Sequence, residues 1–181
     1  MDEIKVCMSL RSLLPADAPS IAGWARDPEF CREAGWSTSL GRQAHLEFQD
    51  RIISSPPPGL LRLGAEVGGI LVGYVDLHGT APDTRELGFL IGERDRWGQG
   101  LGRRAAAAGL DHGFGELGLK VIWAEALEGN RRSMGILRGL GFTETGPGTI
   151  GEFRGVTGVH RRFALSAREW GLRDAPWIPS L

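Results

Sequence analysis

Three glycines alternate with other residues in the middle of the chain: Gly98, Gly100 and Gly102. Glycine lets the backbone adopt positive φ angles and lets a ligand approach the main-chain amides. The Ala-rich segment that follows predicts a helix, whose first turn has unpaired N–H groups and a partial positive charge. Four arginines surround the glycines: Arg94, Arg96, Arg103 and Arg104. The pattern predicts a polyphosphate site, although a tight turn without a ligand needs the same glycines.

Other site chemistries leave no comparable pattern. A P-loop needs Gly-Lys followed by Ser or Thr, and a dinucleotide fingerprint needs G-x-G-x-x-G after the first strand; neither arrangement occurs. The four histidines stand apart from one another in the sequence, so we expect no metal site. They are His45, His78, His112 and His160.

Composition excludes several classes of protein. The 181 residues suit one domain with its own core. A net charge of −1, without any run of five like charges, argues against non-specific binding to nucleic acid or anionic membranes. Cys7 and Cys31 are too few for a disulfide framework, so we expect reduced thiols. The acidic start and the lack of an apolar run of ~20 residues favour a soluble cytoplasmic protein.

The first third of the chain predicts one strand and two helices. Residues 5–10 favour a strand, and residues 18–25 favour a helix with Asp17 as its N-cap. We expect a loop over 27–40, which contains proline, glycine and serines, and a helix over 42–54. Three consecutive prolines at 56–58 end that helix.

The rest of the chain predicts a sheet with two helices. Strands over 61–67 and 70–77 are joined by the hairpin signal Gly68-Gly69. The remaining expected elements are a strand over 84–92, a helix over 100–117, a strand over 121–126, a helix over 130–139, and strands over 143–150 and 159–166.

Four sequence blocks keep a familiar order. They are Glu86-Leu87-Gly88-Phe89, the loop Trp97-Gly98-Gln99-Gly100-Leu101-Gly102, the segment from Asn130-Arg131-Arg132-Ser133 to Leu140-Gly141-Phe142, and residues 160–165 with Glu169-Trp170 behind them. Together they resemble the GNAT superfamily of acyl-CoA N-acyltransferases. Trp97 stands where the general motif has Gln or Arg, as in the branch of ribosomal-protein N-terminal (alanine) acetyltransferases.

The resemblance implies a fold and a cosubstrate. The fold is α/β (α+β), a single mixed, mostly antiparallel central sheet of about seven strands flanked by helices. Residues 1–181 form one domain, with a cofactor-binding core at about 84–142 and acceptor-covering helices at about 15–55. The cosubstrate is acetyl-CoA, without a metal. The implied cofactor-binding residues are Phe89, Leu90, Ile91, Arg96, Trp97, Gly98, Gln99, Gly100, Leu101, Gly102, Arg103, Asn130 and Ser133.

The reaction needs a base for the amine and a partner for the departing thiolate. Our candidate base is Glu86, directly or through water, and the alternative is a solvated strand-edge glutamate. A main-chain N–H of residues 89–91 would meet the oxyanion. Many family members place a tyrosine at the position of Leu137, so the thiolate partner here is Ser133 or water. Asn130 would contact the pantetheine or serve only as a helix N-cap, and Ser133 would alternatively face solvent.

The acceptor amine cannot be read from the residues. Trp24, Trp36 and Phe48 would either clamp it or pack in the interior. The candidate acceptors are a protein N-terminus, an amino acid, a polyamine and an aminoglycoside. The alternative function is a non-catalytic acyl-CoA-binding sensor or interaction module. His160 would line the acceptor pocket or be structural.

We also expect a homodimer, because four late aromatic side chains lack evident partners. They are Phe153, Phe163, Trp170 and Trp177. The alternative is that Trp170 and Trp177 fold back on their own sheet.

Overall fold

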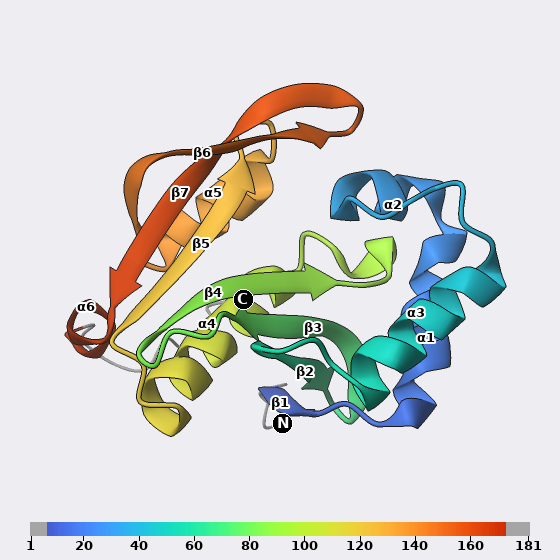
Figure 1. Cartoon of the computed structure of the whole chain (residues 1–181), viewed down its shortest axis with the longest axis horizontal. Helices are drawn as coiled ribbons and strands as arrows, with labels where there is room; N and C mark the ends of the chain where they lie inside the picture. The colour runs from blue at the N-terminus through green and yellow to red at the C-terminus, as the bar shows by residue number, and fades with distance from the viewer. Residues whose placement is uncertain (1–6, 173–181) are drawn as a thin grey trace, which may run out of the picture.

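The computed structural model describes residues 7–172 and contains one seven-stranded sheet (Figure 1). The spatial order is β1-β2-β3-β4-β5-β7-β6. The β4 and β5 strands run parallel, and every other neighbouring pair is antiparallel, which confirms the mixed, mostly antiparallel sheet. The strands are β1 (Met8–Ser12), β2 (Leu60–Val67), β3 (Ile70–His78), β4 (Thr84–Ile91), β5 (Val121–Leu127), β6 (Thr143–Phe153) and β7 (Val156–Ser166).

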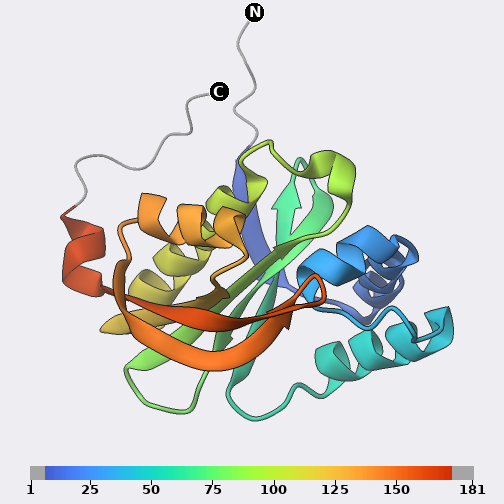
Figure 2. The same ribbon diagram turned by 90° about the horizontal axis from the view of Figure 1, so that it is seen from above.

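Helices cover both faces of the sheet (Figures 1 and 2). One face carries α4 (Leu101–Asp111) and α5 (Arg131–Gly139), and the other carries α1 (Ala18–Gly23), α2 (Pro28–Ala34) and α3 (Arg42–Ser54). A π-helical segment, His112–Glu116, continues α4, and α6 (Ala167–Gly171) follows the last strand. Single 3-10 turns lie at Pro15–Asp17, Trp24–Arg26 and Arg94–Arg96. None of the described helices is long and apolar enough to cross a membrane.

Two apolar clusters hold these layers together. The larger lies between the sheet and helices α4 and α5, where Ala105 and Ala106 are fully buried and let α4 approach the strands closely. The smaller joins α1 and α2 to β3 through Ile21, Phe30 and Tyr74. Burial of such side chains is the main source of stability. Helices α1 and α2 are therefore anchored through a separate, smaller core.

The α2 helix replaces the loop that the sequence suggested for 27–40. The Asp27 carboxylate accepts the Glu29 N–H at 2.9 Å, Pro28 occupies the first helical position, and Gly35 ends the helix at φ +67°. These are ordinary start and stop signals. The loop prediction was wrong because Pro28 was taken as a breaker rather than as the first residue of a helix.

Asp17 occupies the N-cap position of the first helix, as predicted, but its side chain makes no capping hydrogen bond. Asp17 precedes α1, but its carboxylate accepts the Leu14 N–H at 2.7 Å and pairs with Arg11 instead of capping the helix. The helix itself ends at Gly23, and a 3-10 turn follows. By contrast, the helix over 42–54 and the Gly68-Gly69 hairpin are confirmed.

The late aromatic side chains find partners within the chain. Phe163 is fully buried in the larger cluster, and the Trp170 indole N–H donates to Asp111 Oδ1 at 2.8 Å. The argument that these side chains lack partners is therefore wrong at Phe163 and Trp170. Trp177 lies outside the described residues, and the homodimer stays a prediction.

Replacing Phe163 by Ala should lower the free energy of unfolding by about 3–5 kcal/mol, because it empties a fully buried ring site. Urea unfolding followed by circular dichroism measures the loss. Phe153→Ala is the control, since Phe153 is only half buried near the end of β6 and should cost clearly less. Native stability with altered self-association in F163A would instead place Phe163 at an interface.

Candidate active site

The sheet opens between β4 and β5. The two strands pair only over Thr84–Glu86 and Val121–Trp123, and the rest of β4 has no partner strand on that side among the described residues (Figure 1). Antiparallel pairing of β4 with β3 continues to Ile91. One edge of β4 therefore presents main-chain groups to the gap.

Strand geometry decides which amides face the gap, because successive residues of a strand direct their N–H and C=O groups to opposite edges. Gly92 N–H donates to Val72 C=O at 2.9 Å, and a Cβ on Gly73 would clash with the Leu90 carbonyl oxygen. Leu90 is thus directed to β3, whereas Phe89 and Ile91 face the gap. Of the three residues expected to bind a ligand by their main chain, Leu90 has its amide turned away.

The glycine loop lies at the far end of this gap. Gly98 and Gly100 have φ angles of +76° and +75°, and a Cβ on either would point into open space. Gly100 directly precedes α4, so the unpaired N–H groups of the first helical turn follow it. The Trp97 indole N–H donates to Ile91 C=O at 3.0 Å and fixes the loop against the end of β4.

A groove of about 820 Å³ connects the gap with the loop. It is lined by twelve of the thirteen residues expected to bind a cofactor: Phe89, Leu90, Ile91, Arg96, Trp97, Gly98, Gly100, Leu101, Gly102, Arg103, Asn130 and Ser133. Gln99 does not line it, because its side-chain amide turns back to donate to Asp95 C=O at 2.8 Å. Arg94, expected among the arginines around the glycines, also lines the groove, and sequence reasoning missed Ile136 and Arg132, which line it too.

Arginine side chains make the loop end of the groove basic. Arg96 pairs with Glu93 at 2.7 Å, Arg94 pairs with Asp27, and the Arg103 guanidinium donates to Gly139 C=O at 2.7 Å. Arg132 lies over the Trp97 ring, with its Cζ 5.5 Å from the ring centre. Arg104, expected beside the glycines, is not among the lining residues. The basic groups and the helix terminus together suit a polyphosphate.

A second cavity of about 310 Å³ adjoins the groove. The two share Glu33, Ala34, Asn130 and Ser133, so they meet where α2 approaches the start of α5. Three glutamates, Glu33, Glu125 and Glu152, line the second cavity together with His160, and no Lys or Arg of the described residues does. Of the two alternatives for His160, the structure shows it lining this cavity. Its Nδ1 lies 3.0 Å from the Thr149 carbonyl oxygen. A basic groove therefore opens into an acidic cavity.

Asn130 and Ser133 lie at the junction of the two cavities. Asn130 Oδ1 accepts the Ser133 N–H at 3.1 Å and caps α5, so the capping interpretation of Asn130 is observed. Ser133 is half buried and lines both cavities rather than facing bulk solvent. Leu137, one turn further, is 1% exposed and belongs to the core.

Glu86 is at the last pairing of β4 with β5, opposite Trp123. Burial raises the pKa of its carboxyl group, the negative charge of Glu125 raises that pKa further, and His78, Arg162 and His160 oppose the shift. Glu86 lines neither cavity.

Glu125, which sequence reasoning did not single out, does line the second cavity. It accepts from Arg162 Nε at 2.8 Å and from Arg162 Nη2 at 2.5 Å. The neighbouring β5 residues Ile122, Ala124 and Ala126 are buried while Glu125 is on the opposite face. The sequence predicted only a strand over 121–126, and the apolar Val121 and Trp123 on the same face as Glu125 left no polar alternation to mark that face.

Trp24, Trp36 and Phe48, which the sequence offered as a clamp or as packing residues, do not gather at one site. Trp24 and Trp36 pack into the smaller cluster around Phe30, whose ring lies 5.1 Å from that of Trp36. Phe48 is exposed on α3. The packing interpretation therefore holds for the two tryptophans. Within residues 7–172, His, Cys, Asp and Glu side chains form no group of three that would hold a metal.

Comparison with known proteins supplies the family. Residues 8–143 match the family described as acetyltransferase (GNAT) domain. The chain belongs to this acetyltransferase family. The spermidine N-acetyltransferase of Vibrio cholerae, solved with CoA and spermine, is 20% identical, with a TM-score of 0.75 over 90% of this chain and 97% of that one. The aminoglycoside acetyltransferase AAC(6')-Ib, solved with coenzyme A, is 17% identical, with a TM-score of 0.76 over 92% and 98%.

One curated relative also matches. It is described as uncharacterized protein MJ1062 of Methanocaldococcus jannaschii and is 35% identical over 82 residues. Those residues are 45% of this GNAT chain but only 17% of the relative. The chain thus corresponds to a small part of that protein.

Replacing Gly100 by Val should weaken CoA binding at least tenfold (about 1.4 kcal/mol), because the side chain would occupy the space above the first amides of α4. Calorimetric titration with CoA measures this. Gly118→Val is the matched control, since Gly118 is exposed, has a φ of +64° and lies outside the groove. Both variants should lose similar stability. Equal CoA affinity in the two would refute the phosphate-loop assignment.

Proposed function

We propose that this chain is an acetyl-CoA-dependent N-acetyltransferase that moves an acetyl group to a primary amine by direct attack of the amine on the thioester. The observation that supports it most is the continuous path from the glycine loop, along the free edge of β4, to the acidic cavity. Such a path suits a long cosubstrate whose reactive end must meet a cationic acceptor. The four sequence blocks further support an acceptor such as the N-terminal amine of a protein, in the ribosomal-protein branch; a small-molecule amine would enter the same cavity.

The groove fits acetyl-CoA on structural grounds. The backbone of Phe89 and Ile91 faces the gap and would pair with the pantetheine arm as a further strand would. The first amides of α4 and the arginines would hold the pyrophosphate. Acetyl-CoA supplies the activated acyl group, and a main-chain N–H of the β4 edge would stabilise the negative charge that develops on the thioester oxygen.

Two carboxylates, Glu125 and Glu86, would act on the amine, one by attracting it and the other by removing its proton. Glu125, held by Arg162 and lining the cavity, would attract the ammonium form of the acceptor. Glu86 lines neither cavity, but its carboxyl group interacts electrostatically with Glu125 and His160, which line the second one, and its raised pKa makes it a stronger base than an ordinary glutamate. We therefore propose Glu86 as the general base acting through a water molecule. Ser133 would donate a hydrogen bond to the departing thiolate, because it lies where the two cavities meet.

The function is tested by incubating the protein with acetyl-CoA and a panel of primary amines that includes peptides, a polyamine and an aminoglycoside. Release of free thiol, dependent on the amine, is the expected result. CoA binding measured by calorimetry without turnover on any amine would contradict the enzyme and favour an acyl-CoA sensor.

Replacing Glu86 by Gln should lower kcat by roughly 10²- to 10⁴-fold, the usual contribution of a general base, with CoA affinity unchanged. The acidic limb of the kcat/KM profile should lie above the ordinary range of a glutamate, because the Glu86 pKa is raised, and should disappear in E86Q. Glu125→Gln should mainly raise KM, since Glu125 is proposed to attract the amine. The reverse pattern, a large loss of kcat in E125Q only, would transfer the base role to Glu125.

A further inference from the structure

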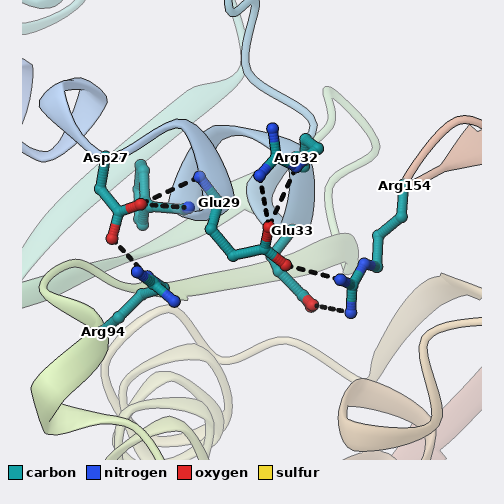
Figure 3. A network of polar contacts seen from close by, with 7 residues as sticks. Asp27, Glu29, Arg32, Glu33, Arg94 and Arg154 are labelled. Atoms are coloured by element: carbon teal, nitrogen blue, oxygen red, sulfur yellow. Dashed lines mark hydrogen bonds and ion pairs between the residues drawn. The ribbon is translucent and has the colours of Figure 1, made fainter.

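An arginine at the tip of the β6–β7 hairpin reaches across to α2 (Figure 3). Arg154 Nη1 donates to Glu33 at 2.9 Å and Nη2 donates to Glu29 at 2.6 Å. The two carboxylates are more than 120 residues away in the sequence and one helical turn apart on α2. We call this pair of contacts the α2 tie. It joins α2 directly to the C-terminal hairpin, whose tip lies beside α2 in both ribbon views (Figures 1 and 2).

The turn that carries Arg154 is unusual for that residue. Arg154 and Gly155 form the two-residue connection between β6 and β7, with φ angles of +54° and +79°. Both central positions of such a hairpin turn require positive φ, which favours Asn, Asp or Gly. Arg154 is the one residue other than glycine with positive φ in the part of the chain that the structure describes. An arginine against the local preference indicates that its guanidinium is needed there.

The α2 tie lies at the edge of the acceptor cavity. Glu33, Ala34 and Gly35 of the α2 end form one wall, and Glu152 and Phe153, which directly precede Arg154, form the opposite wall. Of the three residues of the α2 tie, Glu33 lines both this cavity and the cofactor groove, whereas Glu29 and Arg154 line the groove alone, so the tie lies where the two meet. A link between Arg154 and Glu33 therefore fixes the separation of the two walls.

We propose that Arg154 is a specificity-determining residue: its ion pairs to Glu29 and Glu33 hold the acceptor cavity at a width that admits slender cationic primary amines and excludes bulky ones. The proposal rests on the acetyltransferase function proposed above.

The chemistry of the walls sets the charge of the acceptor. Glu33, Glu125 and Glu152 line the cavity, so an amine that arrives as an ammonium ion is attracted. The cavity volume of about 310 Å³ is at the low end of ligand pockets, which suits an alkyl amine or the end of a peptide. A branched, multi-ring amine needs the walls to separate.

The strength of the α2 tie suits such a control. Glu29 and Glu33 are four residues apart on one helix, where like charges repel, and Arg154 neutralises that repulsion. The Arg154 side chain is half exposed, and exposed ion pairs contribute little to overall stability. Removing the Arg154 guanidinium should therefore let the end of α2 move away from the hairpin without unfolding the protein.

Arg154→Asn removes the guanidinium while Asn favours the positive φ of the turn. We expect kcat/KM for kanamycin, relative to that for putrescine, to rise roughly threefold or more in R154N, as loss of two weak ion pairs permits. Arg32→Ala is the matched control, because Arg32 pairs with the same Glu29 at 2.5 Å but lies on α2 itself and joins no second element. R32A should keep the wild-type ratio.

A second measurement needs no catalysis. Ala34→Cys on a Cys7→Ala background places a thiol in the cavity wall, while the remaining Cys31 is buried and its pKa is raised by burial. The rate of labelling by fluorescein maleimide relative to iodoacetamide should rise when Arg154→Asn is added. Raising the salt concentration from about 0.1 M to about 1 M, which shortens the Debye length from ~10 Å to ~3 Å, should raise the same ratio with Arg154 present but not in R154N.

Different results would refute the acetyltransferase function and the role of Arg154. No turnover with any amine refutes the acetyltransferase, whereas the labelling ratio still tests the α2 tie. An unchanged labelling ratio in R154N, or an equal rise in R32A, would overturn the role of Arg154. So would a kinetic change in R154N that affects putrescine and kanamycin alike.

Discussion

The separation of β4 from β5 after Glu86 is the constraint on which the site depends. A continuous sheet would use every main-chain group of β4, and no edge would remain for a ligand. The parallel pairing at Thr84–Glu86 holds the two strands together at one end, while the loop after β4 and the start of α5 lie at the open end. The groove, the junction at Ser133 and the acidic cavity all follow from this one opening.

The cofactor side could be predicted from sequence because its determinants are local. Gly98 and Gly100 need positive φ, and the alanines after them favour helix by their own propensity. The direction of the Phe89 and Ile91 main-chain groups follows from strand alternation once the strand and its β3 partner are known. Gln99 fell outside the groove because a side-chain amide can bond its own loop, and no spacing rule indicates that choice.

The acceptor side could not be predicted in the same way, because distant contacts build it. Glu125 reaches the cavity only through the register of β5 against β7, and Glu33 only through the placement of α2 beside the hairpin. Phe163 seemed unpartnered until the sheet order placed β7 between β5 and β6, inside the larger core. These contacts form only in the tertiary structure, so the local sequence around each residue does not predict them.

The small size of α2 has a consequence for motion. Seven residues are well below the ~12–15 at which an isolated helix begins to persist in water, so α2 exists through Phe30 in its small cluster and through surface charges. Such a segment opens at a free-energy cost below that of global unfolding. Its amide protons will exchange with solvent ahead of those in β3 and β4, as a separate cooperative unit. The α2 segment can therefore unfold locally while the sheet and the larger core stay intact.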